Sequence, residues 1–175
     1  QFRNFERSSL GVVPFGLAFA QSCNTAFITA AAEVPDADLV AAADSFGFNT
    51  TYTIGLDTAG GSFPAPADAT EHAAATIGQG RVTASPLHMA TVAGTVIDGT
   101  WEPPVLLPDL PTEAPPAPTT LAAGTSDTLM GLMRRVVAEG SGTRAAVPGV
   151  DIAGKTGTAE FGTGDPPPTH AWFIG

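Results

Sequence analysis

One stretch near the C-terminal end combines the residue types that a carboxylate-binding site needs, Ala153 to Glu160 (A-G-K-T-G-T-A-E). Lys155 is the only lysine of the chain, and the hydroxyl residues Thr156 and Thr158 follow it. A strand edge with one cation and two hydroxyl groups, where Gly157 lets a ligand approach the backbone, is suited to hold a carboxylate. For a lone K-T-G triplet, a lysine on a solvated edge strand is the more common explanation, so other motifs must decide.

The second polar stretch is Ser22-Cys23-Asn24, in the N-terminal part of the chain. Taken alone, Ser22 is typical of a helix cap and Asn24 of a turn. Cys23 invites comparison with a thiol nucleophile. No cysteine-hydrolase pattern surrounds it, however, and a small buried packing role is favoured.

The other titratable side chains do not predict a metal site. His72, His88 and His170 are far apart in the sequence and lack the spacing of zinc ligands. Glu160 is better explained as a solvated or turn-stabilising carboxylate than as a general base. The Met and Val spacing after Ser85 fits core packing. We therefore expect neither a metal nor a cofactor.

Length and charge limit the possible partners. At 175 residues the chain is one domain or a large piece of one, and 43% hydrophobic residues can form a single core. A net charge of −10 excludes the basic stripe that nucleic-acid binding needs, and it disfavours an anionic membrane surface. One cysteine permits no internal disulfide. No segment has the length and polarity of a membrane span or a signal peptide.

Apolar periodicity and capping residues predict a series of helices that position the two polar stretches. Two short helices are expected to meet at Ser22, because their large apolar residues do not form one unbroken stripe. A Ser85-Pro86 start and a Gly99 end mark a later helix, and Ser126-Asp127 is expected to cap the last one. The predicted helices are at 15–21, 23–33, 37–46, 86–98 and 128–139.

Two strands near the C-terminal end are expected to form a hairpin, at 150–157 and 169–174, joined by a Gly/Pro turn. Residues 50–68 are expected to be loop with a short strand at 52–54, and 77–80 a glycine turn. Residues 103–118 hold seven prolines and must be an extended surface connection. The fold class is therefore α+β, a helical subdomain packed on an antiparallel sheet that is incomplete in this chain.

Taken together, these motifs resemble the penicillin-binding protein transpeptidase domain, of the serine acyl-transferases marked by S-x-x-K, S-x-N and K-T-G. The resemblance covers nearly the whole chain. Each motif alone is weak, but their order matches that of the family. The segments that carry the resemblance are Ala20 to Phe27, Ile77 to Gly80, Ser85 to Ala90, Gly140 to Thr143, Ala153 to Glu160 and His170 to Phe173.

The resemblance implies a role for each polar residue of the two stretches. Ser22 would lie near the nucleophile and relay a proton, and Asn24 would hydrogen-bond the substrate backbone. Lys155 would keep the site electropositive. Thr156 and Thr158 would bind the terminal carboxylate, and the N–H of Thr158 would stabilise the oxyanion beside Gly157.

The family's nucleophile motif is missing from these residues. S-x-x-K requires a lysine, and Ile152 stands three positions before Lys155. In the family that motif precedes S-x-N by a few dozen residues, which here falls before Gln1, and the sheet continues beyond Gly175. We therefore expect a partial transpeptidase domain at 1–175 that is inactive alone, with the remaining N- and C-terminal segments of the same domain as its partners.

By resemblance, the parent protein cross-links peptidoglycan by serine acyl transfer from D-Ala-D-Ala stem peptides and binds β-lactams covalently. It would act outside the cytoplasmic membrane, anchored in it, beside other cell-wall synthesis proteins. The alternative is a non-catalytic pseudoenzyme or a β-lactam-sensing domain. An S-x-x-K upstream of Gln1 would separate an enzyme or covalent sensor from a non-catalytic module.

Overall fold

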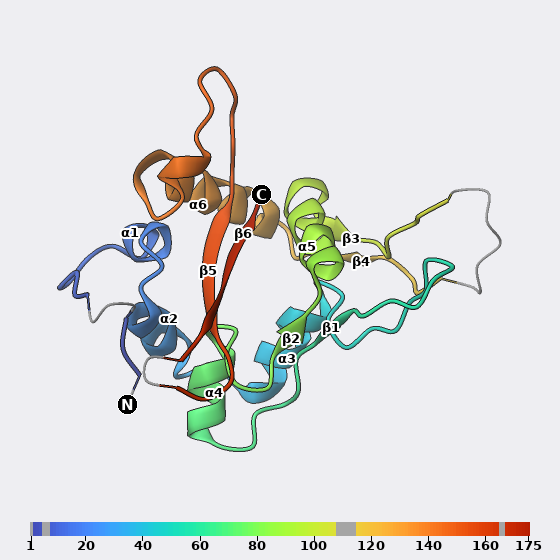
Figure 1. Ribbon diagram of the computed structural model, residues 1–175, viewed down its shortest axis with the longest axis horizontal. Helices are drawn as coiled ribbons and strands as arrows, with labels where there is room; N and C mark the ends of the chain where they lie inside the picture. The colour runs from blue at the N-terminus through green and yellow to red at the C-terminus, as the bar shows by residue number, and fades with distance from the viewer. Residues whose placement is uncertain (1, 5–7, 108–114, 165–166) are drawn as a thin grey trace.

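The computed structural model describes residues 2–4, 8–107, 115–164 and 167–175. The β5–β6 hairpin lies in the middle of Figure 1, with α1 and α2 on one side of it, α5 on the other, and α6 across its upper end. The helices are α1 (Phe15–Ala20), α2 (Asn24–Ala31), α3 (Asp36–Asp44), α4 (Ala69–Ala75), α5 (Pro86–Asp98) and α6 (Thr125–Glu139). The strands are β1 (Gly61–Ser62), β2 (Thr83–Ala84), β3 (Thr100–Trp101), β4 (Thr119–Thr120), β5 (Lys155–Glu160) and β6 (Thr169–Ile174).

Each strand pairs with one antiparallel neighbour, which gives three two-stranded sheets among the described residues: β1–β2, β3–β4 and β5–β6. The β5–β6 register runs from Lys155 opposite Ile174 to Glu160 opposite Thr169. The predicted C-terminal hairpin is therefore confirmed, and so is the mixed α+β class with its antiparallel pairing.

The core lies where α1, α5 and α6 meet. Phe19, Val96, Met133 and Val136 form its buried cluster, and Leu129 and Leu132 pack against it. Four of the residues that α6 gives to this core share one face because of the 3.6-residue period of the helix: Leu129, Leu132, Met133 and Val136. The start of β5 also packs on α6, so the core fixes the strand that carries K-T-G.

Several helix ends follow their sequence signals. Ser85 caps α5 by accepting a hydrogen bond from His88 N–H at 3.1 Å. Gly99 ends the same helix in the left-handed conformation, with φ of 72°. The two helices predicted to meet at Ser22 are α1 and α2. Helix α4 was not predicted, although its N-cap is conventional: Asp68 accepts from Thr70 N–H and Glu71 N–H at 2.8 and 2.9 Å.

Ser126 was wrongly predicted to cap the last helix. Gly124 is the N-cap, and Ser126 lies inside α6, where its hydroxyl donates to Val96 O at 2.5 Å. The left-handed conformation of Gly124, with φ of 80°, allows the helix to begin earlier than the serine suggests. Ser126 therefore joins α6 to α5.

Two strand predictions also differ from the structure. No strand forms at 52–54; the strand of this region is β1 at 61–62, which pairs with β2. The last hairpin begins at Lys155 rather than at residue 150, because backbone N–H groups of residues 150–154 bond partners other than β6. Val150 N–H closes a turn on Val147 O at 3.1 Å, and Gly154 N–H donates to Met133 O of α6 at 3.2 Å.

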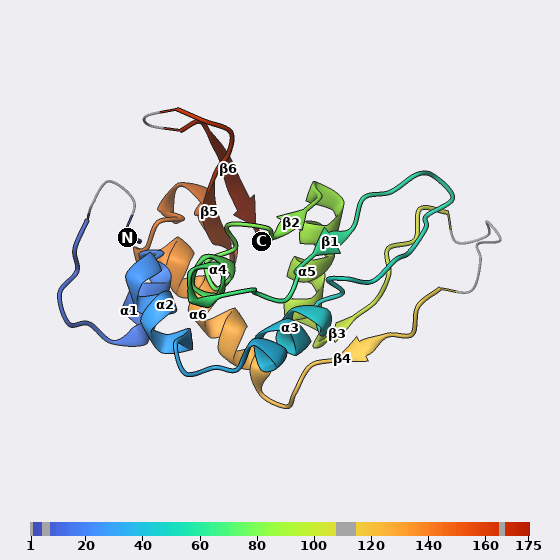
Figure 2. The same cartoon turned by 90° about the horizontal axis from the view of Figure 1, so that it is seen from below.

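The proline-rich connection was predicted to be extended. Its described parts, 103–107 and 115–118, contain no helix or strand and reach away from the helices in Figures 1 and 2, whereas 108–114 fall outside the described residues. Trp101, at the base of this connection, is almost fully buried, and its indole N–H donates to Thr91 Oγ1 at 3.1 Å. None of the helices in the described part of the chain has the length and apolar character to cross a membrane.

Candidate active site

The structure brings together two residues that are 133 positions apart, Ser22 and Lys155. Ser22 lies between α1 and α2 in the left-handed conformation, with φ of 55°. Lys155 is the first residue of β5, and its Nζ donates to Ser22 Oγ at 2.8 Å and to Thr156 O at 2.9 Å. Left-handed backbone costs free energy for a residue with a Cβ, and functional sites are where such conformations gather.

The surroundings of Lys155 weaken its hold on a proton. The side chain is half-buried beside α1, and Nζ lies 5.8 Å from the centre of the Phe19 ring. Removal from water disfavours the charged form and lowers the pKa of Lys155 to about 8. A lysine in this condition can pass a proton near neutral pH, which an exposed lysine with its ordinary pKa does poorly.

Ser141 connects the two halves of the site, a role that the sequence analysis did not predict. It lies in the turn after α6, and its N–H donates to Ala20 O at 2.9 Å, at the end of α1. Its hydroxyl contacts Thr156 Oγ1 at 2.5 Å and Ala20 O at 3.3 Å. Gly140 permits this approach, since a Cβ there would lie 2.2 Å from Ala20 O. The sequence marked Gly140 to Thr143 as a segment that resembles the family, but it predicted no contact of Ser141.

One edge of β5 pairs with β6, and the other edge does not. The register of the hairpin shows which backbone N–H and C=O groups of β5 face each edge. Phe161 N–H donates to Pro168 O at 3.0 Å, so the pair that follows Glu160 and Thr169 is a hydrogen-bonded one. Because such pairs alternate in antiparallel sheets, the backbone groups of residues 155, 157 and 159 face β6. Those of Thr156 and Thr158 face the other edge. The N–H of Thr158 therefore points to the free edge, as an oxyanion donor must.

Gly157 and Thr158 are placed for access to that edge. A Cβ at Gly157 would lie 3.3 Å from Trp172 Cβ, so glycine keeps the hairpin close at this point. Thr158 is exposed, and its carbonyl oxygen accepts a hydrogen bond from Gln79 Nε2 at 3.1 Å. Gln79 comes from the turn after α4, which sequence reasoning identified as a turn but not as part of the site.

Asn24 does not join the contact between Ser22 and Lys155. Its side-chain amide donates instead to Arg3 O at 3.3 Å, while Asn4 Oδ1 accepts from Thr25 N–H at 3.0 Å. The segment at 2–4 thus lies over the start of α2. Cys23 is buried, 7% exposed, as its predicted packing role requires.

The described residues hold no group of three or more His, Cys, Asp or Glu side chains that could bind a metal ion. His72 instead bonds to Asp36 Oδ1 and Ala31 O, at 2.6 and 3.0 Å. His88 is fully buried, and neither of its ring nitrogens has a partner within the described structure. The site that the structure assembles consists of Ser22, Lys155 and the edge of β5.

Comparison with known proteins identifies the class to which this fold and site belong. The family model of the penicillin binding protein transpeptidase domain matches residues 1–175. The chain therefore belongs to the penicillin-binding protein transpeptidase family.

Individual relatives agree with this assignment. The chain is 39% identical over 173 residues to the peptidoglycan D,D-transpeptidase PbpA of Mycolicibacterium smegmatis, and 34% identical over 178 residues to PbpA of Mycobacterium tuberculosis. Each alignment covers 90% of this chain and 34% of the relative, so the chain spans about a third of the length of the curated relatives it matches.

Solved structures show the same fold. The crystal structure of PBPA from M. tuberculosis superposes with a TM-score of 0.82 at 29% identity, covering 98% of this chain and 42% of that one. The penicillin G acyl-enzyme complex of penicillin-binding protein A from M. tuberculosis superposes with a TM-score of 0.80 at 30% identity, with the same coverage. These structures confirm the fold class expected from the sequence.

Proposed function

We propose that residues 1–175 are part of a D,D-transpeptidase domain that cross-links peptidoglycan by serine acyl transfer and is acylated by β-lactams. The observation that carries the proposal is the 2.8 Å contact between Lys155 Nζ and Ser22 Oγ. It joins the K-T-G and S-x-N motifs of a family member whose relatives are named peptidoglycan D,D-transpeptidases.

In the proposed reaction, a serine of an S-x-x-K motif outside residues 1–175 attacks the carbonyl carbon between the two D-alanines. The C–N bond breaks, and the leaving amine must gain a proton. The hydroxyl proton of the attacking serine goes to the lysine of its own S-x-x-K motif. Ser22 gives its hydroxyl proton to the leaving amine while its oxygen takes a proton from the Lys155 ammonium group, which regains one from solvent. The 2.8 Å contact and the lowered pKa of Lys155, about 8, support this relay.

The remaining site residues take binding roles in the proposal. The hydroxyls of Thr156 and Thr158 hold the terminal carboxylate of the stem peptide, and Thr158 N–H stabilises the oxyanion beside Gly157. Asn24 bonds the substrate backbone once it leaves Arg3 O. The hydroxyl of Thr156 contacts Ser141 Oγ in the structure. In the proposal, Ser141 therefore orients the Thr156 hydroxyl toward the carboxylate.

The rest of the domain completes the site. In the proposal, its segments supply the S-x-x-K serine and further strands, and cover the apolar groove of about 790 Å³ that α5 and β6 form. Met89, Ile97 and Phe173 are among the residues that line this groove. The parent protein acts outside the cytoplasmic membrane, anchored in it, and works with other cell-wall synthesis proteins. A related structure described as a peptidoglycan synthase complex, with a TM-score of 0.67 at 26% identity, supports such partners.

Intact-mass measurement after incubation with a penicillin tests the proposal. The full-length protein should gain the mass of one penicillin, and a chain of residues 1–175 should gain none. A full-length protein that stays unmodified would identify a pseudoenzyme instead. An adduct on residues 1–175 would mean that one of these residues is the nucleophile and would overturn the assigned roles.

A further inference from the structure

The free edge of β5 offers a short row of backbone groups to a ligand. The carbonyl oxygens of Thr156 and Thr158 both point to this edge, away from β6. Lys155 Nζ already bonds the first of them at 2.9 Å. An extended peptide that pairs with a strand edge needs such carbonyls as acceptors for its own N–H groups. Of these two carbonyl oxygens, Thr158 O is therefore the one that Lys155 leaves to a ligand.

In the structure, Thr158 O already accepts a hydrogen bond from the side chain of Gln79. Gln79 Nε2 donates to Thr158 O at 3.1 Å, although the two residues are 79 positions apart. Gln79 is only half-buried, so its side chain has water beside it and room to turn. The side-chain amide of Gln79 donates to the same oxygen, Thr158 O, that the N–H of a bound peptide would use. The two donors therefore compete for it.

The backbone of Gln79, in contrast, is held firmly. Gly78 and Gly80 on either side adopt φ of 70° and 72°, a conformation that residues with a Cβ rarely take. Gln79 N–H donates to Ala74 O at 2.9 Å, which ties the turn to the end of α4. The position of the side chain is thus set by the turn and not by the strand it touches.

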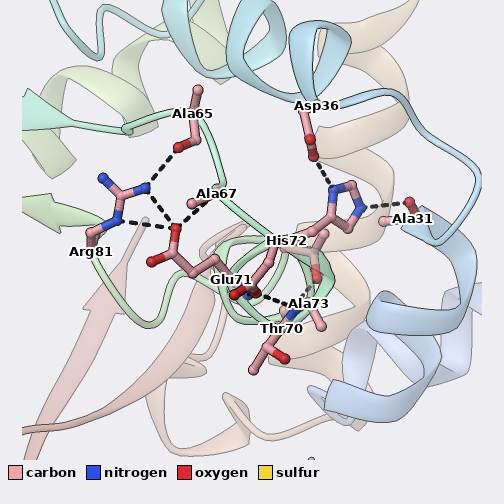
Figure 3. A network of polar contacts seen from close by, with 11 residues as sticks. Ala31, Asp36, Ala65, Ala67, Thr70, Glu71, His72, Ala73 and Arg81 are labelled. Atoms are coloured by element: carbon pink, nitrogen blue, oxygen red, sulfur yellow. Dashed lines mark hydrogen bonds and ion pairs between the residues drawn. The ribbon is translucent and has the colours of Figure 1, made fainter.

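Ion pairs and hydrogen bonds fix α4 and its turn to their neighbours, as Figure 3 shows. Arg81, two residues after Gln79, bonds Glu71 Oε2 at 2.6 Å and Ala65 O at 2.7 Å. His72 on the same helix bonds Asp36 of α3 and the last residue of α2, Ala31. A ligand can therefore displace the Gln79 side chain by rotation, without moving the turn.

We propose that Gln79 is the gate of the β5 edge: its side-chain amide occupies Thr158 O in the free protein and swings away when a ligand with an amide N–H pairs with that carbonyl, a role that rests on the proposed function. Gln79 makes no contact with the reacting atoms in this role. It sets selectivity, because a ligand with an amide N–H must break the Gln79 bond to reach Thr158 O, whereas a ligand without one leaves that bond in place.

The test measures the second-order rate constant of acylation of the full-length protein by penicillin G, which has an acylamino N–H. Gln79→Ala removes the donor, and Gln79→Asn keeps an amide but shortens it by one methylene. Both variants should be acylated about fivefold faster, because penicillin G no longer has to break the Gln79 bond. A factor of about five corresponds to the net free energy of one hydrogen bond. A carbapenem, which has no acylamino group, should gain a smaller advantage from either change.

Thr76→Ala is the matched control. Thr76 is the C-cap of α4, three residues before Gln79, and its hydroxyl bonds a backbone carbonyl of the same helix, Ala73 O at 2.9 Å. Its rate should equal that of the parent protein. Slower or unchanged acylation of Gln79→Ala, or an equal gain in Thr76→Ala, would overturn the gate alone. A parent protein that penicillin G does not acylate at all would overturn the proposed function and the gate with it.

Discussion

Lys155 Nζ and Ser22 Oγ lie 2.8 Å apart, joining the first residue of β5 to the bend between α1 and α2. If this contact relays the proton to the leaving amine, removal of the hydroxyl should slow penicillin acylation of the full-length protein by about 10²-fold. Ser22→Gly is the cleaner variant. Glycine accepts the left-handed conformation, φ of 55°, without strain, so the backbone stays in place. Stopped-flow measurement of acylation gives the rate.

Ser22→Ala serves as the companion variant. It removes the same hydroxyl but keeps a Cβ in the left-handed conformation, so it should be as slow as Ser22→Gly and thermally less stable. If only the alanine variant were slow, backbone position and not the hydroxyl would govern the rate.

The pKa of Lys155, about 8, predicts how acylation depends on pH. Below this pKa the side chain is an ammonium group that can donate to Ser22 and attract a carboxylate. Above it, both functions are lost, so the acylation rate should fall as the pH rises through about 8. Rate measurements between pH 6.5 and 9.5, about the range over which such a group titrates, check the prediction.

Lys155→Arg provides the comparison, because a guanidinium group remains charged throughout this range. Its rate should be lower at neutral pH, since arginine fits the contact with Ser22 less well, but the decrease near pH 8 should vanish. A parent rate that increases through pH 8 would instead make Lys155 a proton acceptor.

Gly140 holds the end of α1 against the end of α6, and no side chain fits between them. A Cβ there would lie 2.2 Å from Ala20 O and 3.0 Å from Val136 Cα. Gly140→Ala should therefore reduce the free energy of unfolding by about 1–3 kcal/mol, the usual cost of overpacking. It should also slow acylation, because Ala20 is two residues from Ser22. Urea unfolding and acylation kinetics measure the two effects.

Gly131→Ala is the control for this change. Gly131 lies inside α6, and a Cβ there has no neighbour within 4 Å. Alanine favours the helix by about 1 kcal/mol over glycine, so this variant should be more stable than the parent and equally active. Equal losses in both variants would show that α6 tolerates no added methyl group, and that Gly140 has no special position.

The sequence predicted those parts of the fold that have long local patterns. The apolar stripe of α6 and the Ser85-Pro86 start of α5 lie within a few residues, and both helices formed there. Strands of two residues, such as β1 at 61–62, are too short to show a period of two. Asp68 did signal the start of α4, but the alanine-rich helix behind it has no apolar stripe to extend that signal.

The residues of the candidate site also fall into two groups, those that the sequence predicted and those that it did not. Lys155 and Ser22 stand in family motifs, so they could be identified before the structure placed them together. Ser141 and Gln79 bond backbone carbonyls that are 121 and 79 positions away. A carbonyl group is the same in every residue, so nothing in the local sequence distinguishes the ones that will be bound. Such partners become visible only when the chain is folded.

His88 predicts an acid-sensitive step in stability. Its side chain is fully buried against Phe48 and Gly61, with neither ring nitrogen bonded in the described structure, and burial lowers the pKa of His88. Below the unfolded pKa of about 6.5, the unfolded chain binds a proton that the folded chain refuses. The free energy of unfolding should therefore fall as the pH drops from 7 to 5, about the window in which histidine titrates.

His88→Leu removes that titration and two unbonded polar atoms, so it should be as stable as the parent at pH 7 and more stable at pH 5. His72 acts in the opposite sense, since its bond to Asp36 raises the pKa of His72 and stabilises the fold at low pH. Both proteins keep His72, so its contribution cancels in the difference between them. Urea unfolding of both at the two pH values measures that difference. Equal pH dependence in the two proteins would show that His88 is already protonated or solvated in the folded state.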